Sequence, residues 1–242
     1  MQSGVYVGLS AKLALKQRME TLAHNVANMN TPGFRAEEIR FETLLAKSAN
    51  TQISFSSAGD TYVSMAAGQM VQTGNKLDVA ITGNGWMAIQ TPEGRAYTRD
   101  GRFVMSATGA LNTINGQAVL DVGGAPIQLD PNGPAPVIAK DGMITQGGAQ
   151  MGAIGLFAMD PAAKLTRAPG SAVRPDREPA PIVDFVRTGL AQGVIENANV
   201  NPVMEMSRLI AVQRLFESVS AGIDAAEASM TDSIRTLGSS TS

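Results

Sequence analysis

The chain has 242 residues, enough for one large domain or two smaller ones, and with 17% charged residues and a formal net charge of −2 it has no basic patch that would indicate a nucleic-acid partner. No apolar run reaches the roughly 18 residues that a membrane-spanning helix requires. The sequence has no cysteine, which excludes disulfides, thiol catalysis and cysteine-bound metals.

The N-terminal part predicts an amphipathic helix over residues 4–29. Its apolar residues recur at alternating spacings of four and three, which is typical of a helix that buries one narrow seam against another helix. These seam residues are Leu15, Met19, Leu22, Val26 and Met29. The Pro-Gly pair at residues 32–33 then ends the helix, because proline restricts the residue before it. Charged residues between 12 and 20 rule out a cleavable signal peptide. We therefore expect a cytoplasmic protein or an export route that reads an uncleaved N-terminus.

The middle of the chain divides into a linker and a β domain. Residues 36–74 are largely polar and predict an extended linker, with a short helix possible over AEEIRFETLLAK. Residues 75–190 alternate short apolar runs with turn signals such as Asp100-Gly101, which predicts antiparallel hairpins in a sandwich or open barrel. Five of the twelve prolines fall in residues 160–181, so we expect an irregular loop there.

The C-terminal part predicts the longest helix, over residues 201–238. Asn201 suits the N-cap, Pro202 suits the first helical position, and residues 239–242 are expected to fray. Its seam contains Leu209, Val212, Phe216, Val219, Ile223, Met230 and Leu237. At 1.5 Å per residue this helix would be roughly 54 Å long, so its seam needs partners outside a compact domain.

Both terminal helices are expected to lie together. Residues 1–30 carry a net charge of +2 and residues 200–242 a net charge of −2, which is consistent with pairing. An intramolecular hairpin of two helices is the simpler interpretation. However, apolar residues off the seam indicate more than one neighbour. These are Val203, Met206, Ile210 and Leu215.

Candidate catalytic and metal-binding residues do not form a convincing site. His24 is the sole histidine and has no second ligand at helical spacing, so it predicts a structural or surface role. Gly83-Asn84-Gly85 and Gly123-Gly124 predict turns, because neither precedes a lysine as a phosphate loop does. Several aspartates lie beside turns or strand ends, where aspartate is ordinary. They are Asp78, Asp100, Asp121, Asp130 and Asp141. Trp86 predicts core or sheet-face packing.

Two segments resemble the signatures of the flagellar basal-body rod and hook protein family. LAHNVANMNTPGFRAEEIRFE, residues 22–42, is similar to its N-terminal signature, and NANVNPVMEMSRLIAVQRLFE, residues 197–217, to its C-terminal signature. Between them, LDVAITGNGWMAIQ and YTRDGRFVMSATGALNTINGQAVL resemble the family's β domain. His24 and Met29 depart from the usual pattern. The residues that carry the resemblance are Asn25, Asn28, Asn30, Thr31, Pro32, Gly33, Phe34, Asn199, Asn201, Glu205, Gln213, Arg214 and Glu217.

The resemblance implies an axial structural protein and not an enzyme, with no catalytic residue, cofactor or metal. It implies an α+β fold whose discontinuous terminal helices pair as a coiled coil beside a central, mainly antiparallel β domain. The implied domains are 1–35, the linker 36–74, 75–190 and 191–242. Expected partners are other rod subunits, further copies of the chain stacked helically around a central channel, and the flagellar type III export apparatus, with no nucleic acid or small-molecule substrate.

The implied location is the periplasmic rod of the basal body, reached without a cleaved signal peptide. The proximal-rod branch of the family is the best match, and a distal-rod or hook-type protein is the alternative. An exported cell-wall enzyme with helical oligomerisation ends is the rival from another class. Such an enzyme needs a nucleophile–base pair or a metal cluster, and the sequence offers one histidine and no cysteine. Export information is expected near the N-terminus, including the apolar pair Phe41 and Leu45.

Overall fold

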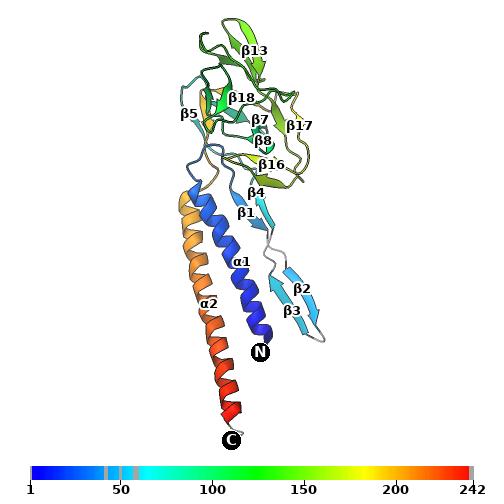
Figure 1. Ribbon diagram of the computed structural model, residues 1–242, viewed down its shortest axis with the longest axis vertical. Coiled ribbons are helices and arrows are strands. Elements are labelled where there is room, and N and C mark those ends of the chain that lie inside the picture. The colour runs from blue at the N-terminus through cyan, green and yellow to red at the C-terminus, as the bar shows by residue number, and fades with distance from the viewer. Residues whose placement is uncertain (1, 41–42, 49–50, 57–59, 240–242) are drawn as a thin grey trace. The chain divides into compact units, whose positions relative to one another are not determined.

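The structure is a computed structural model that describes residues 2–40, 43–48, 51–56 and 60–239, and it has an α+β fold (Figure 1). The chain forms two compact units. We call residues 1–27, 37–62 and 201–242 the helical unit, and residues 28–36 and 63–200 the β unit. Each unit is thus assembled from segments that are far apart in the sequence. In the part of the chain that the structure describes, neither helix is long and apolar enough to span a membrane.

The helical unit contains both helices of the structure, α1 (Gln2–Ala27) and α2 (Pro202–Ser239), which run side by side in opposite directions (Figure 1). The Asn201 side chain caps α2, because its Oδ1 accepts a hydrogen bond of 3.1 Å from the Met204 N–H. Pro202 occupies the first helical position, where no N–H is needed. Both helix predictions are confirmed to within two residues at each end. Fraying was expected for residues 239–242, of which residues 240–242 lie outside the described residues.

The helical unit also contains two pairs of strands, except for Val63, the last residue of β4, which belongs to the β unit. Strand β1 (Glu37–Arg40) pairs with β4 (Asp60–Val63), and β2 (Thr43–Ser48) forms an antiparallel hairpin with β3 (Thr51–Ser56). The short helix considered over AEEIRFETLLAK is therefore wrong. In β1, half-buried and exposed side chains alternate with the period of two that a strand produces, and Ile39 is one of the half-buried residues. Phe41 lies outside the described residues, and for Leu45 only the backbone of β2 is described.

The β unit is built from short antiparallel strands. Its largest sheet has six strands in the order β15-β16-β8-β7-β14-β17, and β12 is the centre of a three-stranded sheet with β11 and β13. Three further antiparallel pairs are β9 with β10, β6 with β18, and β5 with β19. The strands are β5 (Met70–Gln72), β6 (Val79–Thr82), β7 (Trp86–Thr91), β8 (Gly94–Thr98), β9 (Phe103–Met105), β10 (Leu111–Thr113), β11 (Val137–Ile138), β12 (Met143–Gln146), β13 (Ala149–Ala153), β14 (Leu156–Ala158), β15 (Leu165–Arg167), β16 (Val173–Pro175), β17 (Ala180–Pro181), β18 (Gly189–Gln192) and β19 (Val194–Glu196).

The proline-rich stretch 160–181 is not the irregular loop that the sequence predicted, because it supplies β15, β16 and β17. Two of its prolines sit in positions that strands tolerate. Pro175 is the last residue of β16, and Pro181 lies on β17, the edge strand of the six-stranded sheet. A proline at a strand end or sheet edge leaves no gap in a central ladder.

The β unit has its own hydrophobic core. Its largest cluster joins residues of many strands, among them Val79, Met87, Phe103 and Ile144, which are at most 1% exposed. Trp86 is 3% exposed in a second cluster with Tyr97 and Phe157, so its predicted core packing is confirmed. The Tyr97 and Phe157 rings meet edge to face, with centroids 5.4 Å apart.

Candidate assembly surface and signature segments

The two helices of the helical unit face each other in a constant register. A Cβ on Gly8 would lie 3.0 Å from Ile223, the Lys12 Nζ lies 5.4 Å from the centre of the Phe216 ring, and Asn25 Nδ2 is 3.2 Å from Glu205 Oε2. Because the residue numbers rise on one helix as they fall on the other, these pairs establish an antiparallel arrangement.

Most seam residues predicted from the sequence are buried or half-buried on the two helices, and Phe216 and Ile223 lie next to Lys12 and Gly8 of α1. Leu22 and Val212 are 7% and 6% exposed. Half-buried are Leu15, Met19, Val26, Leu209, Phe216, Val219 and Ile223. Met29 is different, because α1 ends at Ala27 and Met29 lies in the turn beyond it, within the β unit. The side chains of Met230 and Leu237 lie outside the described residues. Whether these residues also form seams between subunits remains a prediction.

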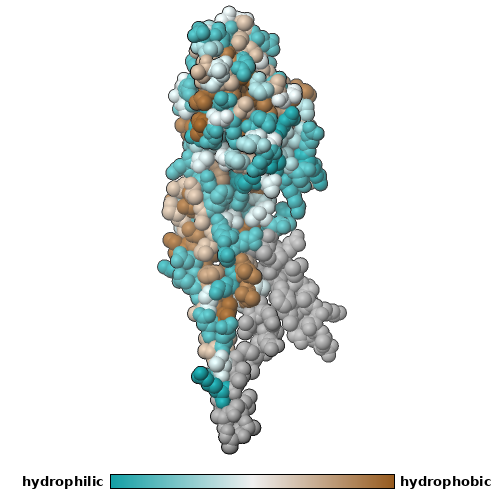
Figure 2. Space-filling view, viewed as in Figure 1, coloured by the Kyte–Doolittle hydropathy of each residue, from teal (hydrophilic) through white to brown (hydrophobic). Residues whose placement is uncertain are grey.

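Other apolar side chains of the helical unit point to solvent. On α2 the exposed set is Val203, Met204, Met206, Ile210 and Leu215, with exposures between 42% and 75%. On α1, Leu9 and Leu13 are 47% and 56% exposed. Figure 2 shows such hydrophobic residues on the surface of the helices among hydrophilic ones. A surface of this kind on a long helix is typical of an interaction site.

A polar clasp fixes the end of α1 to the start of α2. Asn25 is 3% exposed, and its Nδ2 donates hydrogen bonds to Glu205 Oε2 and to the Glu37 carbonyl, the latter at 2.9 Å. Its Oδ1 accepts a 2.8 Å hydrogen bond from the Glu37 N–H. Glu205 is also held by Arg208 Nη1 at 2.8 Å. Asn25 and Glu205, one from each signature, therefore stabilise the helical unit together.

Within the β unit, the remaining parts of the two signatures also contact each other. Asn199 Oδ1 accepts a hydrogen bond of 2.6 Å from the Ala36 N–H, and the Asn199 N–H donates to the Phe34 carbonyl at 3.3 Å. Phe34 is 2% exposed. Gly33 has a φ of +68°, and a Cβ there would lie 2.2 Å from the Asp100 backbone nitrogen, so only glycine fits.

A buried ion triad lies next to this contact. Glu196 Oε1 binds Arg35 Nη2 at 2.8 Å, and Glu196 Oε2 binds Arg99 Nε at 2.7 Å. The Gly68 N–H also donates to Oε1. Glu196 is 1% exposed, while Arg35 and Arg99 are each 2% exposed. The triad therefore connects three segments of the β unit through one carboxylate; we call these three residues the Arg–Glu–Arg triad.

The two arginines of the triad differ in how many hydrogen bonds their side chains donate. Arg99 donates further hydrogen bonds to the carbonyls of Ile81, Gly83 and Gly85, which also fixes the turn predicted at Gly83-Asn84-Gly85. The Nε and Nη1 groups of Arg35 are buried and have no hydrogen-bond partner among the described residues. Burial first, and then the nearby positive charge of Arg99, lowers the pKa of Arg35 to about 10, although Glu196 opposes this shift.

The other predicted residues have local structural roles. Thr31 bonds to Asn28, Pro32 is buried, and Asn30 is exposed. On α2, Gln213 Nε2 lies 3.2 Å from Glu217 Oε1, and these two residues and Arg214 are exposed. His24 Nδ1 lies 3.4 Å from Glu37 Oε2. Among the described residues no group of three or more His, Cys, Asp or Glu side chains could hold a metal ion.

The predicted turn aspartates do close turns. Asp121 Oδ1 accepts a hydrogen bond from the Ala125 N–H, and Asp130 and Asp141 accept bonds from backbone N–H groups two residues further on. Asp100 binds the Arg102 side chain through both carboxylate oxygens, which raises the pKa of Arg102. These four aspartates thus have the local structural role that their sequence positions indicate.

The comparison with protein families agrees with this arrangement. Residues 5–35 match the family described as flagella basal body rod protein, and residues 191–236 match the C-terminal part of the flagellar basal body rod FlgEFG proteins. Residues 80–146 match the D1 domain of the flagellar hook protein FlgE/F/G. The three matches follow the order of α1, the β unit and α2.

Relatives match over almost the entire chain. The flagellar basal-body rod protein FlgF of Mesorhizobium japonicum is 47% identical over 239 residues, which is 99% of each chain. FlgF of Rhizobium meliloti is 44% identical over 99% of this chain and 100% of the relative. The flagellar basal-body rod protein FlgG of Bacillus subtilis is 28% identical over 90% of this chain and 92% of the relative. The chain therefore belongs to the family of flagellar basal-body rod proteins, in which it is similar over its full length to proteins named FlgF.

Proposed function

We propose that this protein is a structural subunit of the flagellar rod that polymerises through α1 and α2, with these helices forming a coiled coil that packs against helices of neighbouring subunits. The observation that carries this proposal is the exposed apolar set on α2, in which Ile210 and Leu215 are each 53% exposed. A monomer gains nothing from such residues, whereas a helical assembly buries them at every subunit.

The proposal extends to location and partners. The chain is a subunit of the proximal part of the periplasmic rod, delivered by the flagellar type III export apparatus without a cleaved signal peptide, and it assembles with further rod subunits. Helices α1 and α2 supply the coiled-coil part and the β unit supplies the β domain. It acts in motility as part of the drive shaft and carries out no chemical reaction. The relatives named flagellar basal-body rod protein FlgF support a place in the rod.

The test replaces an outward apolar residue by a charged one. Leu215→Lys is expected to leave the free energy of unfolding of the isolated protein within about 0.5 kcal/mol of the parent, because the Leu215 side chain is already 53% exposed in the monomer. The same variant should be exported, fail to enter basal bodies and leave cells non-motile, because a lysine would be buried at each contact. Swimming in soft agar and immunoblots of purified basal bodies measure these outcomes.

Ser218→Lys is the matched control, because Ser218 is exposed on the same helix and is not apolar. This variant should assemble and swim. If Leu215→Lys also assembles and swims, the two helices form only an intramolecular pair and the proposed polymerisation surface is wrong. Secretion of both variants must be equal, so that loss of assembly is separated from loss of export.

A further inference from the structure

Three segments of the β unit converge on one pocket, which we call the turn pocket. They are residues 90–92 at the end of β7, residues 115–118 after β10, and residues 169–170 between β15 and β16. The turn pocket has a volume of about 740 Å³, which lies in the range of small-molecule sites in proteins. Loops that a sheet holds in place are common positions for binding residues.

Hydrogen bonds hold the walls of the turn pocket in a defined shape. Thr91 is 2% exposed, and its Oγ1 donates to the Gly94 carbonyl at 2.7 Å. The Gln117 N–H donates to Thr113 Oγ1 at 3.2 Å. The Gln117 side chain also connects two of the segments, because its Nε2 lies 3.5 Å from the Pro169 carbonyl. A ligand therefore has little left to order when it binds.

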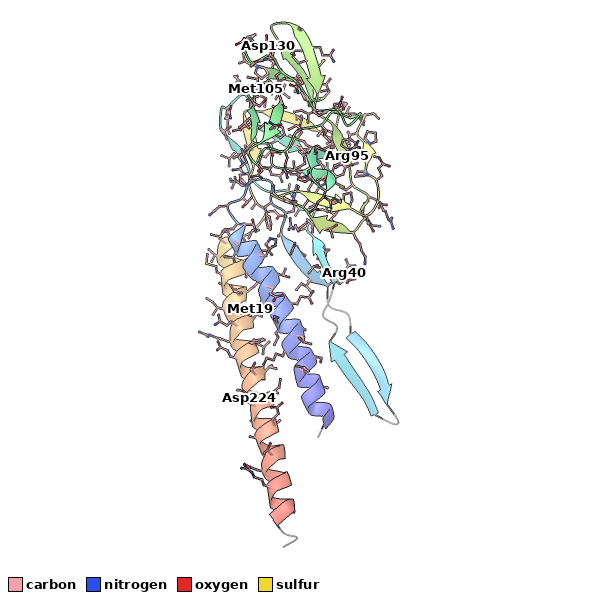
Figure 3. All side chains as sticks on the ribbon, viewed as in Figure 1. Met19, Arg40, Arg95, Met105, Asp130 and Asp224 are labelled. Carbon is pink, nitrogen blue, oxygen red and sulfur yellow. The ribbon has the colours of Figure 1, made fainter. Side chains whose placement is uncertain are left out.

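The lining of the turn pocket is polar and uncharged. Among the described residues no charged side chain lines it. Arg95, labelled in Figure 3, lies opposite Gln90 across β7 and β8 but lines a different pocket. A carboxamide offers both a donor and an acceptor, as a sugar hydroxyl does, so such a lining suits a neutral ligand with many hydroxyl or amide groups. The carboxamides and proline rings of the lining are Gln90, Asn115, Gln117, Pro92 and Pro169.

Asn115 is the side chain that a ligand reaches most directly. It is exposed, and among the hydrogen bonds between described residues none involves its carboxamide. Gly170 makes room for it, because a Cβ at this position would lie 2.8 Å from Asn115 Nδ2. Gly170 also has a φ of +80°, where other residues would be strained. The Asn115 carboxamide thus lies beside the β15–β16 turn with its donors and acceptor available.

The turn pocket suits other classes of ligand less well. Extended peptides bind by adding a strand to a free sheet edge, but backbone groups here are already paired. The Gln90 N–H donates to the Ala118 carbonyl at 2.8 Å, and the Ala168 N–H to the Ala172 carbonyl at 3.0 Å. Proline-rich peptides need aromatic side chains, and among the described residues none lines this pocket. The lack of a lining cation disfavours phosphates and carboxylates.

We propose that the turn pocket binds an uncharged oligosaccharide. The carboxamides of Asn115 and Gln117 pair with neighbouring hydroxyl or acetamido groups, and the rings of Pro92 and Pro169 pack against the apolar faces of the sugar rings. All residues of the site belong to the β unit, so the inference depends neither on the helices nor on the proposed function.

Isothermal titration calorimetry of the full-length protein with neutral trisaccharides tests the inference. The probes are triacetylchitotriose and maltotriose, and at least one of them should bind with a dissociation constant of about 1 mM or lower. The dissociation constant should change by less than about twofold between about 0.05 M and about 0.5 M NaCl, because salt does not screen the contacts of an uncharged ligand.

Substitutions of Asn115 assign the binding to the turn pocket. Asn115→Ala should weaken binding by at least about fivefold, because it removes both a donor and an acceptor. Asn115→Asp keeps the size of the side chain but loses the N–H donors, and should weaken binding by about threefold. Gln128→Ala is the matched control, because Gln128 is an exposed carboxamide of the same unit outside the pocket, and it should bind like the parent. Urea unfolding followed by Trp86 fluorescence checks that each variant is folded.

Failure of both trisaccharides to bind overturns the inference. Binding that neither Asn115 variant weakens, or that Gln128→Ala weakens equally, lies elsewhere on the protein and overturns it as well. If the uncharged peptide acetyl-tetraalanine amide binds more tightly than both sugars, the saccharide is the wrong class of ligand. None of these outcomes affects the proposed function, which rests on the exposed apolar set of α2.

Discussion

The Arg–Glu–Arg triad gives the most sensitive test of how the β unit holds the signature segments. Glu196→Gln keeps the shape of the side chain and removes its charge. Arg35 and Arg99 would then be two cations, each 2% exposed, without the carboxylate that lies within 2.8 Å of both. Breaking a buried ion pair from one side costs about 3–5 kcal/mol. This is a large part of the roughly 5–15 kcal/mol that stabilises a typical domain.

The sole tryptophan provides the assay. Trp86 is 3% exposed in the β unit, so its fluorescence during urea unfolding reports on this unit in the full-length protein. Glu196→Gln should lower the midpoint of the transition without changing its steepness. Glu178→Gln is the control, because Glu178 is exposed in the same unit and its change should shift the free energy of unfolding by less than about 0.5 kcal/mol.

The unequal hydrogen bonding of the two arginines predicts an order of effects on the free energy of unfolding. Arg35→Met removes a cation whose Nε and Nη1 groups lack acceptors and whose pKa is already lowered to about 10 by burial. This substitution leaves the one-to-one pair of Arg99 and Glu196, so it should lower the free energy of unfolding by only about 1–2 kcal/mol. A loss for Arg35→Met that exceeds the loss for Glu196→Gln would refute the reasoning, as would a loss below about 1 kcal/mol for Glu196→Gln.

Two further predictions concern single sites. Asn25→Asp should destabilise the helical unit by about 1–3 kcal/mol, because it places a carboxylate beside Glu205 Oε2, which lies 3.2 Å from Asn25 Nδ2. Helical circular dichroism on heating measures this loss. An unchanged melting curve would show that the polar clasp contributes nothing to stability. The pKa of Asp160 is lowered by the Ala162 N–H and then by Arg177, so this carboxylate stabilises the fold above its ordinary pKa and loses that effect as the pH falls through its lower folded pKa. NMR titration of Arg177→Gln should return the pKa only part of the way, and a complete return would mean that the Ala162 N–H has no influence.

Local sequence signals predicted the elements whose causes are local. Asn201 and Pro202 start α2 as expected, because a cap and a first-turn proline act within four residues of each other. The Pro-Gly pair at 32–33 follows the end of α1 at Ala27, and Gly33 adopts the positive φ that such a turn requires. Each helix carries a repeating apolar stripe, which includes Leu22 on α1 and Val212 on α2. These stripes predicted the helix–helix contact, because such a repeat is visible in the sequence without knowledge of the partner.

Contacts between distant segments could not be predicted in this way. Arg35, Arg99 and Glu196 look like ordinary charged residues beside turns and strand ends, and no spacing in the sequence links them. Only the fold brings all three below 3% exposure. The strands within residues 37–56 were missed for a related reason, because their pairing partners outweigh a helix preference that was weak from the start. The strands β15 to β17 likewise depend on neighbours in the six-stranded sheet.

The structure separates the signature residues into two groups with different consequences for assembly. Asn25, Gly33, Phe34 and Glu205 are buried, and each acts within its own unit, so their changes should alter stability before they alter the choice of neighbour. The second group, Gln213, Arg214 and Glu217, is exposed on α2 and follows Ile210 at helical spacing. Polar residues that continue an exposed apolar stripe can discriminate between partners through unpaired charges, while the apolar residues supply the binding energy. Specific recognition of neighbouring subunits should therefore reside in the exposed stripe of α2, and the buried signature residues should serve to present that stripe in a defined shape.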